Sequence, residues 1–184
     1  MLRPMNMSSK FLAIFAVLLL PCLAGGTESR LAPRITHAPD TPVTPVSFAI
    51  PRYTLTAHER DVVAACLVLE AASQGDLGLR GVMAVIRNRA RGLPELFAPT
   101  VLRRKQFTSM NSATSGQRPL SQLIARAQRD PTWPRALSIV DKATHASWWD
   151  PTAGATHYTL STERNRWTRK LQRTVIIGAH SFYR

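Results

Sequence analysis

The stretch that decides the fold is residues 63–89, VAACLVLEAASQGDLGLRGVMAVIRNR. It begins as an apolar run that a single carboxylate, Glu70, interrupts. Burying an unpaired charge is costly, so a carboxylate in such a run usually takes up a proton or faces a cleft. The alternative is a glutamate at a helix end that reaches solvent or pairs with an arginine of the next helix. Glu70 is therefore a candidate functional residue, with a purely structural role left open.

Helix signals lie on both sides of Glu70. Thr56 and Glu59 form a T-x-x-E capping box, which predicts a helix that begins here and runs to about Ala72. A turn follows at 73–76, and the apolar periodicity after it predicts a second helix over about 77–91.

The rest of the chain changes character part-way. Helices are expected near Pro99 and at about 120–129 and 134–145, with a polar surface loop over 106–119. Strand-like segments follow at 156–160, 174–177 and 181–183. Helices followed by a small antiparallel sheet predict an α+β fold.

The N-terminus has the three parts of a secretory signal. Two basic residues, Arg3 and Lys10, precede an apolar core at 11–20. Small residues then lead to an expected cleavage point near Ala24. A retained anchor is the alternative. The expected organisation is a signal peptide at 1–24, a Pro/Thr-rich linker at 25–55 and one domain at 56–184. We therefore expect a secreted or periplasmic protein.

The formal net charge of the chain is +13, which points to a polyanionic partner. Nucleic acid and an anionic cell wall or membrane surface both fit, and the export signal favours the wall. No zinc-finger spacing, RNA-binding aromatic motif or phosphate-binding loop is present, so we expect no specific nucleic-acid partner. After cleavage only Cys66 would remain, so it cannot form an intramolecular disulfide and is expected to be an inert buried residue.

Four motifs together resemble the SleB/CwlJ-type cell-wall hydrolases, the spore cortex-lytic enzymes. Their opening motif is roughly E-A-R-G-E-x-x-x-G-Q-x-A-V-A-x-V-x-x-N-R, and this chain matches it without a gap at Glu70, Ala71, Gly78, Val82, Val85, Asn88 and Arg89. Residues 106–108 resemble the family's Q-F-S, residues 150–158 its D-P-T-x-G-A-x-x-Y, and residues 177–183 its I-G-x-H-x-F-Y.

The resemblance implies a peptidoglycan-cleaving domain related in architecture to the lysozyme-like lytic transglycosylases, with Glu70 as the catalytic acid. The chain departs from the family at Gln74, which replaces a second glutamate, and at Ala72-Ser73, which replace Arg-Gly. Gln74 can form hydrogen bonds but cannot transfer a proton, so any influence of the second carboxylate on the first is altered.

Cleaving a β-1,4 glycosidic bond requires a proton for the leaving oxygen, and apolar neighbours would help Glu70 to carry it. A hydrolase normally needs a second carboxylate, whereas a lytic transglycosylase needs one, because the C6 hydroxyl of muramic acid attacks intramolecularly. Asp76 and Asp150 are the candidates for a second carboxylate. Asp76 fits better as the N-cap of the second helix, and Asp150, before Pro151, fits better as a turn residue.

Four residues are expected to contact sugar, because amides, hydroxyls and aromatic faces suit pyranose rings: Gln106, Thr108, His157 and Tyr158. His157 and Tyr158 alternate along a strand and should face opposite sides, so one of them should not be a contact. Core packing with the hydroxyl at the rim is the alternative for Tyr158. We expect Asn88 and Arg89 to brace the first helix.

Other aromatic and histidine residues suggest weaker hypotheses. Three tryptophans could form a sugar platform, although core packing is the more usual role: Trp148, Trp149 and Trp167. Three histidines could converge on a metal, but their spacing matches no standard motif: His145, His157 and His180. We expect no metal and no cofactor, and we expect His180 to be a buried hydrogen-bonding residue.

The sequence therefore predicts a monomeric peptidoglycan glycosidase that cleaves the MurNAc-GlcNAc backbone, favouring the lytic transglycosylase outcome. One alternative is a non-catalytic wall-binding module that uses its positive charge and tryptophans. Another is an exported nucleic-acid binder, which should bind random DNA more tightly than sacculi at physiological salt.

Overall fold

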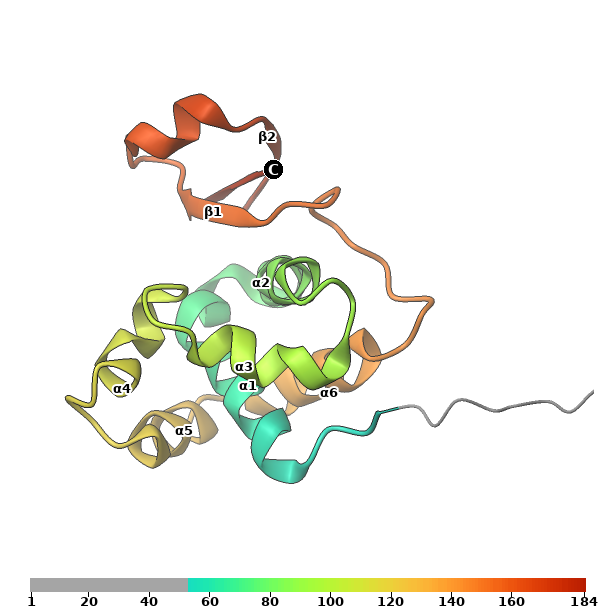
Figure 1. The fold of residues 1–184 in the computed structure, drawn as a ribbon, viewed down its shortest axis with the longest axis vertical. Coiled ribbons are helices and arrows are strands. Elements are labelled where there is room, and N and C mark those ends of the chain that lie inside the picture. The colour runs from blue at the N-terminus through green and yellow to red at the C-terminus, as the bar shows by residue number, and fades with distance from the viewer. Residues whose placement is uncertain (1–52) are drawn as a thin grey trace, which may run out of the picture. The chain divides into compact units, whose positions relative to one another are not determined.

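The computed structural model describes residues 53–184. The expected signal peptide and most of the expected linker lie outside the described residues. The helices are α1 Ala57–Ala71, α2 Gly75–Arg89, α3 Phe97–Leu102, α4 Asn111–Thr114, α5 Leu120–Gln128 and α6 Trp133–Ala143, and the strands are β1 His157–Leu160, β2 Arg173–Ile177 and β3 His180–Tyr183 (Figure 1). This mostly helical arrangement with a small antiparallel sheet confirms the predicted fold class.

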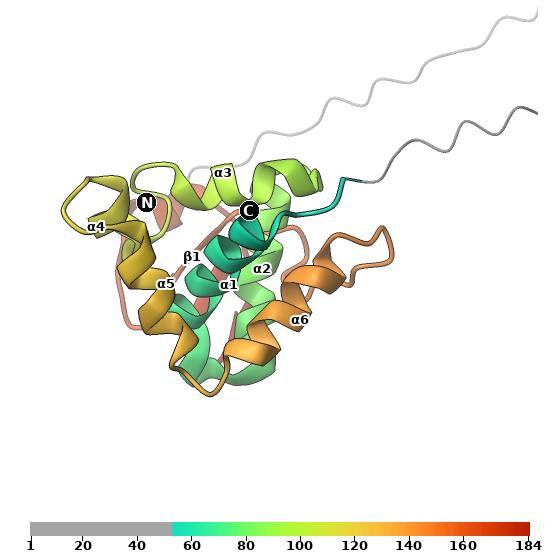
Figure 2. The ribbon, with the colours of Figure 1, turned by 90° about the horizontal axis from the view of Figure 1, so that it is seen from below.

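Helix α1 is the buried centre of the helical layer. It begins at the predicted capping box: the Thr56 side chain accepts a hydrogen bond from the Glu59 N–H, and the Glu59 carboxylate accepts one from the Thr56 N–H. Every residue from 62 to 68 is buried. The helix packs against α2, α3, α5 and α6, and Figure 2 shows it lying between α5 and α6. Such all-round burial explains why the sequence there is apolar without a polar face.

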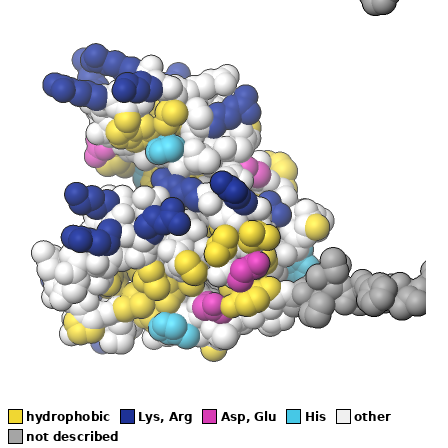
Figure 3. Space-filling view, in the orientation of Figure 1, with side chains coloured by type: hydrophobic (Ala, Val, Ile, Leu, Met, Phe, Trp, Pro, Cys, Tyr) yellow, Lys and Arg dark blue, Asp and Glu magenta, His cyan; other side chains and the backbone are white. Residues whose placement is uncertain are grey.

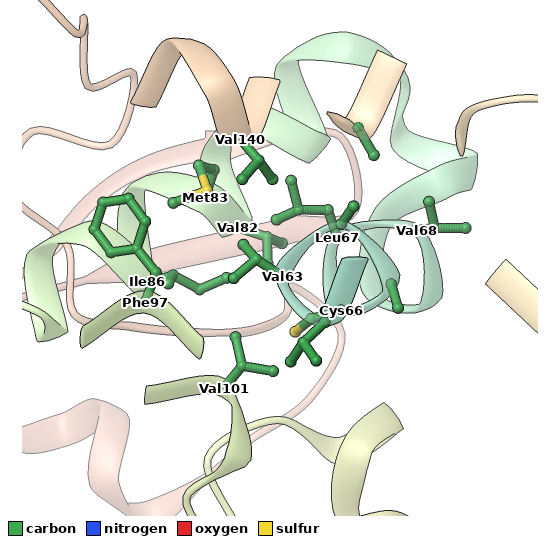
Figure 4. Packing of buried hydrophobic residues seen from close by; sticks show 14 of the residues in the cluster. Val63, Cys66, Leu67, Val68, Val82, Met83, Ile86, Phe97, Val101 and Val140 are labelled. Atoms are coloured by element: carbon green, nitrogen blue, oxygen red, sulfur yellow. The ribbon is translucent and has the colours of Figure 1, made fainter. Parts of the chain in front are cut away.

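Helix α2 joins the two halves of the domain. A short 3-10 turn, η1 (Ala72–Gln74), leads from α1 into α2, and the two helices pack together. Val82, Met83 and Ile86 pack into the helical core with residues of α1 and α3 (Figure 4). Val85 faces the other way and belongs to a smaller cluster with residues of the sheet.

The span Ala57–Arg89 is the one stretch among residues 53–184 that is long and apolar enough to cross a membrane by length and composition. It comprises α1, η1 and α2, and 56% of its most apolar window is buried inside the domain. Its apolar character is therefore accounted for by the core that these two helices build.

The sheet has the strand order β1-β3-β2, with both pairs antiparallel. A tight turn at Gly178 and Ala179 joins β2 to β3, and Gly178 has a φ of 56°, which glycine adopts without strain. The Phe182 ring of β3 lies directly on Gly81 of α2, where an added Cβ would sit 2.7 Å from the ring. A residue without a side chain at position 81 is thus what lets the sheet approach the helices.

Two local expectations were wrong. The segment 106–119 is not a plain surface loop: it contains a 3-10 turn, η3 (Thr108–Met110), and α4, because Phe107 and Met110 are buried in the core and pull it inward. Asp76 does not cap α2. Gln74 occupies the N-cap position without a capping bond, and the Asp76 carboxylate instead pairs with Arg135 of α6.

Candidate active site

A cleft of about 420 Å³ opens between the end of α1, the segment 106–109 and the sheet. Glu70, the penultimate residue of α1, is half-buried in its wall. The Glu70 Oε1 accepts a hydrogen bond of 2.8 Å from the Ser109 N–H, and its Oε2 accepts one of 2.7 Å from the Tyr158 hydroxyl. The ion pairs found among residues 53–184 do not include Glu70. Glu70 does lie at a helix end, but the alternative in which it pairs with an arginine of the next helix is not what the structure shows.

Tyr158 comes from β1 and serves both as core and as site. Its ring centroid lies 5.6 Å from that of Phe182 and 6.5 Å from that of Phe107. Burial, together with the negative charge of Glu70, raises the pKa of the Tyr158 phenol well above its usual value. The phenol therefore keeps its proton and acts as a hydrogen-bond donor to Glu70.

The two expected strand neighbours do face opposite sides. His157 is exposed and lies 5.5 Å from the Trp167 ring, on the face of the sheet away from Glu70. Gln106 and Thr108 line the cleft, and His157 does not. Of the four expected sugar contacts, the structure thus brings Gln106, Thr108 and Tyr158 together with Glu70.

Asn88 and Arg89, at the end of α2, do not brace the first helix as expected. Arg89 donates to two main-chain oxygens, that of Thr156 at 2.7 Å and that of Gln106 at 3.1 Å. Burial lowers the pKa of the Arg89 guanidinium, which also lies over the Phe107 ring. Asn88 donates to the Asp150 carboxylate at 2.9 Å and to the Ala155 oxygen at 3.0 Å. These two side chains hold the second and third motifs against α2.

Neither expected second carboxylate reaches the cleft. Asp150 organises a turn, accepting hydrogen bonds from the Thr152 N–H at 2.6 Å and the Gly154 N–H at 2.9 Å. Burial alone would raise the pKa of Asp150, but hydrogen bonds from Thr152, Asn88 and Gly154 leave it below its usual value. Asp76 is engaged by Arg135, as described above.

The second carboxylate of the cleft is Glu163, which the sequence reasoning did not find. It follows β1, and its Oε2 accepts hydrogen bonds from the Thr159 hydroxyl at 2.5 Å and the Asn165 amide at 3.2 Å. The Thr159 bond, followed by that of Asn165, lowers the pKa of Glu163. One sequence feature could have pointed to Glu163: it is the only acidic residue among residues 151–184, a segment rich in arginine.

His180, on β3, is buried at the cleft wall beside Tyr158, with ring centroids 5.2 Å apart. Burial lowers the pKa of His180 below its usual value of 6.5, and the charges of Glu70 and Glu163 oppose this shift. The expected burial is confirmed, but the Nδ1 has no hydrogen-bond partner among the described residues. Within residues 53–184, no three His, Cys, Asp or Glu side chains are grouped to hold a metal ion.

The remaining sequence candidates lie outside the cleft. Trp148 packs against the helical core under Arg80, and Trp149 is exposed elsewhere. Cys66 is buried as expected, and burial raises the pKa of its thiol well above the usual value, so it is not a nucleophile. Gln74, at the place of the family's second glutamate, accepts a 2.7 Å hydrogen bond from the Ala179 N–H and so ties the helical pair to the β2–β3 turn.

The fold and the site define a class of protein: a small α+β domain whose buried helix presents a carboxyl group to an open cleft beneath a three-stranded sheet. Residues 73–183 match the family model described as Cell Wall Hydrolase, and the chain belongs to this family. The matched range begins just after Glu70.

A solved structure gives the same fold. The catalytic domain of the germination-specific lytic transglycosylase SleB from Bacillus anthracis superimposes with a TM-score of 0.53 at 23% sequence identity. The superposition covers 73% of this chain and 100% of that chain. A search of curated proteins gives no match.

Proposed function

We propose that this cell wall hydrolase cleaves the glycan backbone of peptidoglycan, with Glu70 as the general acid. The observation that carries the proposal is the Glu70 carboxyl group, which two donors orient in the wall of an open cleft. Gln106 and Thr108 line the same cleft and supply polar contacts for sugar hydroxyls.

In this mechanism Glu70 protonates the glycosidic oxygen as the bond to the leaving sugar breaks. Ser109 and Tyr158 hold one carboxyl oxygen each, so the proton is delivered from a fixed position. We infer that Glu70 then accepts the proton of the muramic C6 hydroxyl as that oxygen attacks the anomeric carbon. The product would be a 1,6-anhydro sugar, the outcome expected of a lytic transglycosylase.

Hydrolysis is the second candidate, and Glu163 favours it. This carboxylate lines the cleft with Glu70, and its lowered pKa keeps it ionised at neutral pH, so it could activate a water molecule. Mass spectrometry separates the two outcomes, because an anhydro end is lighter than a reducing end by one water. If the unmodified chain releases products with a reducing end and a Glu163→Gln variant does not, hydrolysis is assigned to this carboxylate.

The proposal is tested by replacing Glu70 with Gln and measuring soluble muropeptides released from purified sacculi. We expect the fold to be kept and the rate to fall at least about a hundredfold, the usual scale for loss of a general acid. Glu95→Gln, an exposed glutamate outside the cleft, is the matched control and should keep full activity. Full activity of Glu70→Gln would contradict the proposal, and binding to sacculi without any release by the unmodified chain would indicate a wall-binding module.

A wall substrate lies outside the cytoplasm, so we propose that the protein is exported. We propose that residues 1–24 direct export and are removed near Ala24, with the linker and the domain following as the sequence predicts. N-terminal sequencing of the protein recovered from cells tests this. An N-terminus at Met1 would contradict cleavage.

A further inference from the structure

A second pocket, of about 210 Å³, lies outside the catalytic cleft. Its lining is polar and basic, and the residues are Arg104, Lys105, Asn111, Thr114, Ser115 and Gln117. The pocket is built by residues just after α3 and by α4 with the turn after it. The Thr114 and Ser115 hydroxyls already donate to main-chain oxygens of the same segment, at 3.3 Å each. The donors available to an anion are therefore the two cations and the amides of Asn111 and Gln117.

The segment that contains this pocket carries positive charge and no acidic residue. No acidic residue occurs between Glu95 and Asp130, whereas the same segment carries six cations: Arg103, Arg104, Lys105, Arg118, Arg126 and Arg129. Arg104 and Lys105 are exposed and take part in neither of the ion pairs found among residues 53–184. Figure 3 shows lysine and arginine side chains gathered on the sheet and on the edge of the helical layer that faces it. An anion in the pocket would therefore meet uncompensated positive charge.

The pocket is fixed close to the catalytic cleft by the chain itself. Lys105 lines the pocket, and the next residue, Gln106, lines the cleft. Arg89 holds the Gln106 oxygen, and the Ser109 N–H bonds to Glu70, so this segment cannot move away from the acid without breaking these bonds. Lys105 adopts a φ of 61°, a conformation that is costly for a residue with a side chain. The two sites are thus neighbours on one restrained piece of backbone.

We propose that this pocket binds a carboxylate of the peptide stem that muramic acid carries, so that the enzyme prefers peptide-bearing glycan over bare glycan. This rests on the glycosidase function proposed above. The stem hangs from a sugar that must occupy the cleft for cleavage, and its free carboxylates are anions. Arg104 and Lys105, the two residues before Gln106, are the cations of the adjacent pocket. The Arg104 guanidinium can donate two hydrogen bonds to one carboxylate, and Lys105 adds a second positive charge.

The test compares initial rates on peptide-bearing glycan strands and on strands stripped of peptides by an amidase. It is run at about 0.15 M salt, where screening beyond about 8 Å suppresses long-range attraction. The unmodified chain should cleave peptide-bearing strands at a lower KM. The double variant Arg104→Gln/Lys105→Gln should raise the KM on those strands about tenfold, with kcat unchanged because the contact is the same before and during the reaction. Its rate on stripped strands should not change.

The matched control is Arg126→Gln/Arg129→Gln, which removes the same charge from exposed positions on and just after α5, outside both pockets. This control should cleave both substrates like the unmodified chain. Equal losses in the two double variants would overturn the proposal, because the effect would then be general charge. Equal KM values of the unmodified chain on the two substrates would also overturn it. Failure of the proposed glycosidase function would look different, with no fragments released from either substrate.

Discussion

The helical layer and the sheet contribute to the same cleft but are stabilised very differently. The helical layer buries a large apolar cluster in which α1 and α2 are central. The sheet rests on a small one, made of Val85, Ala155, Ile177 and Phe182. The proposed acid comes from the well-packed layer, whereas its hydroxyl partner and the second carboxylate come from the sheet side. This difference implies that loosening of the domain starts at the sheet and disables the site before the helices unfold.

The difference in stability between the two layers is tested most directly by Gly81→Val, the variant with the largest expected effect. The new side chain would collide with the Phe182 ring, already 2.7 Å from an ideal Cβ, so the sheet must lift from α2. We expect a loss of about 1–3 kcal/mol or more in the free energy of unfolding, the scale of overpacking, together with loss of activity. Hydrogen exchange should show amides of β1 and β3 losing protection before those of α1.

Ala125→Val, at an exposed position of α5, is the control and should affect neither layer. Equal loss of protection in both layers would mean that they unfold as one unit.

A smaller change separates the chemical contribution of the sheet from its packing. Tyr158→Phe keeps the ring against Phe182 and removes only the hydroxyl that donates to Glu70. Hydrogen bonds to charged groups are worth about 1.5–3 kcal/mol, so we expect a loss of roughly ten- to a hundredfold in kcat. The melting temperature should fall only modestly, because the ring packing is kept. Tyr183→Phe, on the strand β3, is the matched control and should retain activity. An active Tyr158→Phe variant would show that Ser109 alone suffices to orient the acid.

The pH dependence of stability tests the histidines of the sheet. Because burial lowers the pKa of His180 below 6.5, protonation favours the unfolded state, and stability that is complete above pH 6.5 should decline as the pH falls below it. His157 is exposed as a residue, but partial desolvation of its ring, followed by the charge of Arg89, lowers its pKa, so it contributes in the same range. We expect His180→Gln and His157→Gln each to flatten part of the decline in melting temperature between about pH 7 and 5. A decline that is the same in both variants and in the unmodified chain would assign it to other groups.

The smallest effect is expected at Asp76. Its pair with Arg135 is exposed, and exposed pairs contribute little. Asp76→Asn should therefore leave both the melting temperature and the release of muropeptides close to those of the unmodified chain. A large loss of activity would instead return Asp76 to the list of candidate second carboxylates.

Features set by neighbouring residues were predictable from the sequence. The capping box at Thr56, the order of helices and strands, and the opposite facing of His157 and Tyr158 all follow from local periodicity and hydrogen-bonding capacity. The placement of Glu70 in a cleft also agrees with the cost of leaving a carboxylate in an apolar run.

Features that depend on contacts between distant segments were not predictable. The Asp76 N-cap was a sound local interpretation, but Arg135, far along the chain, competes for the carboxylate. Glu163 lines the cleft from the turn after β1, and this turn is held to the β2–β3 turn by the Ser161 N–H, which donates to the Ala179 oxygen. The burial of Phe107 and Met110, which orders the segment 106–119, likewise depends on a core that sequence periodicity does not define.

The side chain of Arg89 has a consequence for how such domains can diversify. It recognises the main-chain oxygens of Gln106 and Thr156, which every amino acid possesses. Substitutions at position 106, which lines the cleft, can therefore alter the surface offered to a ligand while the anchoring of both segments is preserved. An engineer seeking new glycan selectivity could randomise position 106 and leave the arginine untouched.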